Sequence, residues 1–334
     1  MKKKNYKILR ILFPFVLGGA ILYWMYRNFP FSRLEDILLH QMKWMWMLLS
    51  FIPGILAQVF RGLRWKQSLE PLGERPRTSI CINAIFLSYA ASLVIPRIGE
   101  VTRCGVLKSH DSISFPKSLG TVVTERIVDS LIVLLFTGLV LLWQLPVFLR
   151  FFDLTGVGFS GLLNKFTSTG ILVTTICAVC LLAVAFITMK RLSLLKRFQN
   201  SAKQLWAGIL SVKNVRNVPL YLIYSVGIWV AYFFHYYLTF FCFDFTAGIG
   251  LTAGIVSFFV GTIAVIVPTP NGAGSWHLAV KTILVLYGLS QMNAVAFVLI
   301  VHSVQTLLLV VLGVYALFAL QFIHPKKAEK EEAK

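Results

Sequence analysis

The sequence predicts an all-α, polytopic membrane protein. Hydrophobic residues make up 57% of its 334 positions and charged residues only 13%, whereas a soluble globular domain is about half apolar and about a quarter charged. Several windows also reach the roughly 18 nearly uncharged residues that a membrane-spanning helix requires. The composition therefore excludes an ordinary soluble domain, and the elements can be assigned along the chain as helical spans.

Six segments predict complete spans because each is a long apolar run. They are residues 8–26, 43–60, 121–143, 170–189, 219–241 and 293–321. The first run follows basic residues, as in a signal peptide, but no small-x-small cleavage site comes after it. We therefore expect an uncleaved first helix.

Residues 191–214 show a different pattern. Their apolar residues recur at spacings of three, four and seven, and lysines and arginines occupy the rest of the surface. This pattern predicts an amphipathic helix on the cytoplasmic face, where anionic lipids attract its lysines. A helix packed on the transmembrane core would show the same periodicity and is the alternative.

Two further apolar regions, 79–118 and 247–290, are each interrupted by a cluster of proline and glycine. Proline removes a backbone donor and glycine permits unusual dihedrals, so the chain can reverse at each cluster. We expect each region to form a re-entrant helical hairpin that returns to the side it came from. Irregular backbone at such depth is tolerated where it lines a protein or water-filled cavity.

The distribution of basic residues predicts the orientation. They gather before the first span, in residues 61–77 and 190–216, and at the C-terminal end. Cytoplasmic loops retain lysine and arginine, and all of these stretches are cytoplasmic if 79–118 dips in from the cytoplasm and 247–290 from the outside. The prediction is a multi-pass protein of a bacterial-type plasma (inner) membrane with both termini in the cytoplasm.

This arrangement predicts an inverted repeat within one membrane domain, residues 1–322. The halves, 1–165 and 166–322, each contain three spans and one hairpin. An odd number of spans inverts the second half relative to the first, which is a recurring plan of secondary transporters. Residues 323–334 are expected to form a charged cytoplasmic tail. Hydropathy leaves one alternative open, namely eight full spans with both proline-glycine clusters at helix ends.

The formal net charge of +19 does not indicate a nucleic-acid partner. The basic residues lie at membrane boundaries, and no basic face interleaved with aromatic residues is available outside the bilayer. The five cysteines are odd in number and sit mostly in apolar segments, so they predict no disulfide framework. Cys177 and Cys180 lie inside an apolar run, and we interpret them as small packing residues rather than as a metal or redox pair.

The first motif that could carry chemistry is "IPRIGEVTR", residues 95–103, with Arg97, Glu100 and Arg103. Charges inside a bilayer are costly, so they normally face a cavity or one another. Glu100 and Arg103 are three apart and would face together on a short helix after the turn. We expect the two guanidiniums to point at an anionic headgroup, because their planar fork suits phosphate, with Glu100 holding one of them. A structural salt bridge is the alternative.

The second motif is "TVVTERIVDSL", residues 121–131, with Glu125, Arg126 and Asp129. Glu125 and Asp129 share a helix face at i and i+4, and Arg126 can pair with Asp129 at i+3. Beside Arg97 and Arg103 these carboxylates would form a network that could also relay protons. The alternative is that acids near a helix start merely complement its dipole.

The third motif is "AVIVPTPNGAGSWHLAV", residues 264–280. Four helix breakers interrupt it: Pro268, Pro270, Gly272 and Gly274. A helix that starts near Ser275 would aim its free N–H groups at the break, and helix N-termini bind anions. His277 and Lys281 are four apart on that helix in apolar surroundings. A buried histidine is more often a hydrogen-bonded core residue, but a lysine beside it at membrane depth favours a binding site.

The three motifs at these separations resemble those of the flippase-like family, which shares the transmembrane region of bacterial lysylphosphatidylglycerol synthase/flippase proteins. The resemblance extends from the first helix to about residue 322. It implies substrate-site roles for the motif residues, which are Arg97, Glu100, Arg103, Glu125, Arg126, Asp129, Pro270, Gly272 and Gly274. Where members usually carry a glutamate after the last glycine, this chain has His277. If that acid senses a cationic headgroup, this protein is expected to prefer a plain anionic lipid.

The resemblance implies translocation of a membrane lipid, an anionic phospholipid or a lipid-linked headgroup, between leaflets. The chain ends at Lys334 without the soluble aminoacyl-transferase domain of fused members, so lysyl transfer is not expected. The alternatives are an integral-membrane transferase, with Glu100 or Asp129 as base or holding a divalent ion, and a non-catalytic partner of a lipid-modifying enzyme. No nucleotide-phosphate loop, G-x-S-x-G, H-E-x-x-H or D-x-D motif is present, and we predict no cofactor or resident metal.

Overall fold

A computed structural model of the protein describes residues 35–95, 97–154, 210–267 and 269–324, together with residues 16, 19, 21–23, 25–27, 206 and 207. Several predictions lie outside the described residues and stay predictions. They concern most of the span 8–26, the span 170–189, residues 191–205 of the amphipathic helix, the cysteines Cys177 and Cys180, the prolines Pro96 and Pro268, and the tail beyond His324.

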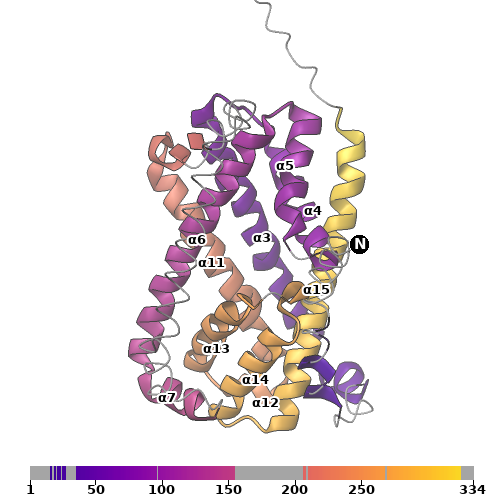
Figure 1. Cartoon of the computed structure of the whole chain (residues 1–334). Coiled ribbons are helices and arrows are strands. Elements are labelled where there is room, and N and C mark those ends of the chain that lie inside the picture. Colours follow the sequence, from indigo (N-terminus) through magenta and orange to yellow (C-terminus); the bar gives the residue numbers. More distant parts are fainter. Residues whose placement is uncertain are drawn as a thin grey trace, which may run out of the picture.

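Four described helices are long and apolar enough to cross a membrane. They are α3 (Trp44–Leu69), α6 (Phe115–Trp143), α11 (Val218–Tyr237) and α15 (Gln291–Phe322). Every regular element in the described ranges is helical, and the long helices run along one bundle (Figure 1). The all-α polytopic membrane fold predicted from the sequence is therefore confirmed.

Short elements extend or connect these helices. They are η1 (Ile37–Gln41), η2 (Glu70–Leu72), α7 (Leu145–Leu154), η3 (Ser211–Asn214), η4 (Leu238–Cys242), α12 (Asp244–Ala247) and η5 (Pro270–Gly272). Lys43 at the start of α3 forms an ion pair with Asp244 at the start of α12, which holds these two connections at the same end of the bundle.

Two pairs of shorter helices form hairpins. The first hairpin consists of α4 (Thr78–Val94) and α5 (Ile98–Asp111), and the second of α13 (Leu251–Ala264) and α14 (Ser275–Leu286). The two legs of each hairpin pack against each other. At a rise of about 1.5 Å per residue the legs are about 18–26 Å long, which is shorter than the roughly 30 Å hydrocarbon core of a bilayer.

The hairpins open toward opposite ends of the bundle. At the open end of the first, Arg77 donates from Nη1 to the backbone carbonyl of His324, just beyond the end of α15, at 3.1 Å. At the open end of the second, Tyr287 donates to Gln144 Oε1 at 3.2 Å, a few residues before α15 begins. Since α15 is continuous, the two openings lie at its two ends, the first hairpin at the top and the second at the bottom of Figure 1.

Both hairpin tips lie beside the middle of α15. Ala90 of α4 packs against Gly313 so closely that a β-carbon there would overlap it. Seven residues before it in α15, Thr306 accepts a 2.8 Å hydrogen bond from the Asn271 side chain in the second tip. The η5 turn also contacts α4, so the two tips approach each other inside the bundle.

Each tip contains residues in a left-handed backbone conformation. In the first, Arg97 has φ of 66° directly before α5, and Gly99 leaves no room for a side chain against Ser88 and Ser92 of α4. In the second, Asn271 and Gly272 both adopt left-handed conformations, with φ of 51° and 71°. Left-handed backbone is least costly for glycine and asparagine, which explains why the helix breaks at the second motif.

One prediction about helix boundaries is wrong. The predicted second span ended at residue 60, with 61–77 as a cytoplasmic loop, whereas α3 continues as one helix to Leu69. Trp65 and Leu69 are fully buried, and Gly62 packs closely on Ile82 of α4. Tertiary packing therefore keeps this basic stretch helical and inside the bundle.

Candidate functional site

The most polar part of the described interior is a cluster of five charged side chains, which we call the arginine network. It consists of Arg61 and Arg64 on α3, Arg103 on α5, and Glu125 and Asp129 on α6, each at most 5% exposed. Burying charge is costly unless it is paired and hydrogen-bonded. The charges can therefore be buried only if α3, α5 and α6 are arranged so that each charged group meets its partner.

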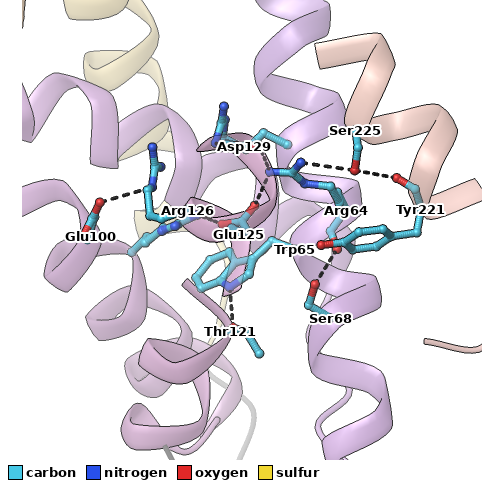
Figure 2. A network of polar contacts seen from close by, with 12 residues as sticks. Arg64, Trp65, Ser68, Glu100, Thr121, Glu125, Arg126, Asp129, Tyr221 and Ser225 are labelled. Carbon is cyan, nitrogen blue, oxygen red and sulfur yellow. Dashed lines mark hydrogen bonds and ion pairs between the residues drawn. The ribbon is translucent and has the colours of Figure 1, made fainter. Parts of the chain in front are cut away.

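The ion pairs of the network are close and interlinked. Asp129 accepts a hydrogen bond from Arg61 Nη1 at 2.7 Å, and its other oxygen lies 2.7 Å from Arg64 Nη2 in an ion pair. Glu125 lies 2.6 Å from Arg103 Nη1 and 3.3 Å from Arg64 Nη2. Each carboxylate thus bridges two guanidiniums, and Arg64 connects the two bridges (Figure 2).

Helical spacing explains how the network forms. Glu125 and Asp129 are four residues apart on α6, so they share a face as predicted, and Arg61 and Arg64 are three apart on α3. Arg103 comes from the first hairpin, because the turn at Arg97 directs α5 back along α6. The network consequently ties a hairpin leg to two spanning helices.

Aromatic rings and hydroxyl groups surround the arginines. The Trp65 ring centre lies 4.7 Å from Arg103 Cζ, within the range of a cation–π contact. The Trp65 indole N–H donates to Thr121 Oγ1 at 2.9 Å, which fixes the ring. Arg64 Nη1 donates to Ser225 Oγ on α11 at 3.2 Å. The site therefore includes a fourth helix.

A second ion pair lies at the outer edge of the network. Arg126 Nε is 3.2 Å from Glu100 Oε1, and these side chains are 45% and 35% exposed. The sequence predicted instead that Arg126 pairs with Asp129 and that Glu100 holds one of the guanidiniums of Arg97 and Arg103. Both predicted pairings are wrong because Asp129 and Arg103 face the interior, while Arg126 and Glu100 meet across the α5–α6 seam (Figure 2).

Arg97 does not join the network. It is exposed at the tip of the first hairpin, and the described residues include no ion pair for it. Its left-handed backbone makes it part of the turn. The expectation that Arg97 and Arg103 point together at one headgroup therefore finds no support in this geometry.

The second motif region forms an uncharged cluster at the tip of the second hairpin. His277 is 3% exposed, and its Nδ1 accepts the Gly274 backbone N–H at 3.1 Å. His302 on α15 lies ring to ring with it at 4.5 Å and contacts the Asn271 carbonyl oxygen through Nε2 at 3.1 Å. This is the hydrogen-bonded core histidine that the sequence analysis kept as one interpretation.

The remaining predicted residues of this region have mainly structural surroundings. Pro270 starts the η5 turn, and Gly272 and Gly274 adopt φ of 71° and 90° within the break. Lys281 is half-buried without an ion pair or hydrogen bond in the described part of the chain. No such interaction joins His277 or Lys281 to the arginine network there.

The described residues also form a cavity outside the arginine network. It has a volume of about 240 Å³ and lies at the end of α3, lined by Gln67, Glu70, Val215, Arg216 and Asn217. Within the described ranges, no three His, Cys, Asp or Glu side chains gather as potential metal ligands.

Arg61 and Arg64 were not predicted as site residues, because their position in a predicted basic loop suggested an orienting role. A signal for them existed. Glu125 and Asp129 lie on one face of an apolar helix, and buried carboxylates require cations on a facing element. Two arginines spaced i, i+3 within reach of the next span meet that requirement.

Comparison with known proteins gives three findings. The family described as lysylphosphatidylglycerol synthase TM region matches residues 11–313. A glycosyltransferase AglD of Haloferax volcanii is 32% identical over 88 residues, which cover 26% of this chain and only 14% of that protein. No solved structure matches the chain.

Proposed function

We propose a function in membrane-lipid translocation from one premise: the chain belongs to the family of the lysylphosphatidylglycerol synthase TM region. Family and apolar helices together indicate a lipid-related role in a membrane. We infer that the protein moves an anionic phospholipid or a lipid-linked headgroup between leaflets, and that its substrate is a lipid rather than a nucleic acid.

The observation that carries the proposal is the arginine network at the seam between the first hairpin and α6. A headgroup that crosses the hydrocarbon core needs polar partners on its way, because charge in lipid is costly. The network supplies three guanidiniums in the interior, and Arg126 and Glu100 supply a polar edge next to it. These residues, with Arg103, Glu125 and Asp129, form the proposed substrate path.

The proposed topology has re-entrant hairpins within an inverted repeat, residues 1–165 and 166–322. Three features support it: the legs are shorter than a bilayer core, the hairpins open at opposite ends of α15, and their tips approach each other. Broken helices that meet near the midplane are a recurring feature of transporter substrate sites. With this topology, and from the distribution of basic residues, we propose that both termini lie in the cytoplasm and that the protein resides in the plasma membrane.

The second hairpin has a supporting role in this proposal. Pro270, Gly272 and Gly274 shape its tip, and His277 holds the Gly274 N–H, so the tip carries no formal charge. Lys281, half-buried on α14, is a cation of the second hairpin that could contact a headgroup. The absence of a carboxylate at position 277 favours an anionic over a cationic headgroup.

The experiment is a leaflet-exchange assay with purified protein in vesicles that contain fluorescent phosphatidylglycerol. Wild-type protein should make inner-leaflet lipid accessible to an external quencher, and Arg103→Gln should reduce that rate at least tenfold. Lys108→Gln, an exposed change on the same helix, is the matched control and should keep the rate. Vesicles with wild-type protein that exchange lipid no faster than protein-free vesicles would contradict the proposal.

A second candidate is a membrane transferase, or the membrane part of one, that acts on a lipid-linked donor. It is supported by the 88-residue similarity to a protein named as a glycosyltransferase. Asp129 would then serve as base or metal ligand, although both its oxygens already pair with arginines. Turnover of a lipid-linked sugar by pure protein, abolished by EDTA, would favour this candidate.

A further inference from the structure

We propose that the Glu100–Arg126 pair is a lateral gate over an anion site at Arg103, and that the ligand is the single phosphodiester group of a membrane phospholipid. This inference rests on the proposed function and specifies its substrate. Two ion pairs connect α5 and α6: in this proposal the Arg103–Glu125 pair belongs to the binding site, and the Glu100–Arg126 pair closes it.

The first argument is the unused hydrogen-bonding capacity of Arg103. Its side chain is 1% exposed, Nη1 lies 2.6 Å from Glu125, and Nε and Nη2 have no hydrogen-bond acceptor. Arg103 Cζ lies 4.7 Å from the centre of the Trp65 ring, and the unpartnered Nε and Nη2 remain for a ligand. A planar N–H edge of this kind is suited to two oxygens of a phosphate.

The second argument is charge. Three guanidiniums against two carboxylates leave one uncompensated positive charge in the network. Uncompensated buried charge is strongly unfavourable, and one anionic group of charge −1 would neutralise it. A phosphodiester carries one negative charge, whereas a phosphomonoester carries about −1.5 to −2 at neutral pH. The site is thus matched to a phosphodiester.

The third argument is the order of the two ion pairs. Glu100 precedes Arg103 by three residues on α5, and Arg126 follows Glu125 on α6, so both pairs connect the same two helices. The inner pair is buried and the outer pair is more than a third exposed. A group that reaches Arg103 from this side must first separate Glu100 from Arg126.

The surface around the gate identifies a lipid as the source of the anion. Val101, Val123 and Ile127 flank the outer pair and are 48%, 37% and 49% exposed. The exposed stripe of α6 continues with leucines, and Arg126 is its charged member, about 17 Å from the helix start at 1.5 Å per residue. Acyl chains can lie along this stripe while the headgroup occupies the seam, whereas a free soluble phosphate gains nothing from it.

These features define a sequence of contacts without any covalent step. The phosphodiester first pairs with Arg126 and displaces Glu100, which turns toward water or the headgroup's polar end. It then reaches the free edge of Arg103, while Glu125 keeps its contact with Arg64. The lipid would be released when the phosphodiester leaves Arg103 toward the opposite leaflet and Glu100 pairs with Arg126 again.

The test is lipid binding to purified full-length protein, measured by native mass spectrometry and by thermal stabilisation. The probes are phosphatidylglycerol, phosphatidic acid, phosphate-free diacylglycerol and soluble glycerophosphoglycerol. Phosphatidylglycerol should bind about tenfold more tightly than phosphatidic acid and the soluble phosphodiester, and diacylglycerol should bind least. Equal binding of diacylglycerol and phosphatidylglycerol would overturn the proposal, and tight binding of the soluble phosphodiester would overturn the lipid source.

Two variants, one that removes a positive charge and one that removes a negative charge, distinguish a ligand-binding role of the network from a structural role. Arg103→Gln should lose phosphatidylglycerol binding about tenfold or more. Glu125→Gln raises the net charge of the network and should keep phosphatidylglycerol while gaining phosphatidic acid. If both variants lose binding equally, the network is only structural and the proposal fails. Should Arg103→Gln not fold, Arg103→Lys keeps the charge without the fork, and unchanged binding there would equally overturn the fork's role.

The gate has its own readout. Glu100→Gln frees Arg126 and should speed the association of phosphatidylglycerol several-fold without changing the preference among probes, whereas Lys108→Gln should change neither. An unchanged or slower association would overturn the gate. Failure of the proposed function is distinguishable, because lipid exchange could be absent while these binding preferences hold, and exchange could occur with no preference for phosphodiesters.

Discussion

The two hairpins have the same construction but opposite chemistry. Each has two short helical legs, a tip with left-handed residues and a position beside the middle of α15. The first places Arg103 in a network of five buried charges. The second stabilises its tip through neutral groups, with His277 on Gly274 and Asn271 on Thr306.

The two hairpins also pack against different kinds of side chain. The second hairpin packs into an aromatic core that includes Phe240, Phe258 and Phe297, whereas the first packs on aliphatic residues, cysteines and Trp65. Apolar packing and neutral hydrogen bonds stabilise a tip without the desolvation cost of charge. Such a hairpin can therefore be built without charge, and the ligand role proposed for the first hairpin would account for the charge there.

The largest effect is expected from Asp129→Leu, which tests how far the first hairpin depends on charge. Removal of this carboxylate leaves Arg61 and Arg64 without their closest acceptor. Breaking a buried ion pair from one side costs about 3–5 kcal/mol. Thermal unfolding in detergent should therefore show a large loss of stability.

Its control is Asp244→Asn, which breaks the exposed pair with Lys43 near the second hairpin's opening. Exposed pairs contribute about 0–1 kcal/mol, so this variant should unfold close to the wild-type temperature. If Asp129→Leu were as stable as Asp244→Asn, the arginine network would not contribute to the stability of the fold.

A smaller effect is expected from Gly99→Ala, which tests the close approach of α4 and α5. A β-carbon at Gly99 would collide with the Ser88 carbonyl and the Ser92 hydroxyl, and overpacking typically costs about 1–3 kcal/mol. Gly105→Ala on the same helix meets nothing within 4 Å and should be stabilising by up to about 1 kcal/mol. The same sign for both variants would show that the hairpin legs are not in contact as described.

A comparable or smaller effect is expected from Asn271→Ala in the second tip. It removes the hydrogen bond to Thr306 and places alanine in a left-handed conformation that asparagine tolerates better, at a cost of about 1 kcal/mol for each contribution. Lipid exchange should fall only as far as the folded fraction falls. Loss of lipid exchange in fully folded Asn271→Ala protein would mean that the second hairpin also contacts the substrate.

The smallest stability effect is expected from Glu100→Gln. Its pair with Arg126 is partly exposed, and such pairs contribute about 0–1 kcal/mol. Unfolding should barely change while lipid association accelerates, and this combination separates the outer pair from the inner one. A stability loss comparable to that of Asp129→Leu would assign the outer pair to the structural core.

Much of the fold could be predicted from the sequence because it follows from hydropathy and helix breakers. The described spans agree with the predicted apolar runs within a few residues at most ends, and both proline-glycine clusters coincide with hairpin tips. The extension of α3 through Arg61 and Arg64 could not be predicted in this way, since a basic helix end and a basic loop have the same composition.

The candidate site was predicted in part. Its acids and Arg103 were identified from buried charge, and the shared face of Glu125 and Asp129 is present. The partners were wrong because local i, i+3 spacing predicts pairs along one helix, whereas Arg126 and Arg103 find partners across the seam. Only tertiary structure decides which face of α5 meets α6.

The most direct test of the account is the sidedness of four single cysteines, at Arg75, Ser112, Gly248 and Gln291, in a background without native cysteines. All four positions are exposed beside the open ends of the hairpins. A membrane-impermeant maleimide should reach Arg75→Cys and Ser112→Cys from one side only, and Gly248→Cys and Gln291→Cys from the other side only. Labelling of Arg75→Cys and Ser112→Cys from different sides would mean that the first hairpin crosses the membrane, which would contradict the account.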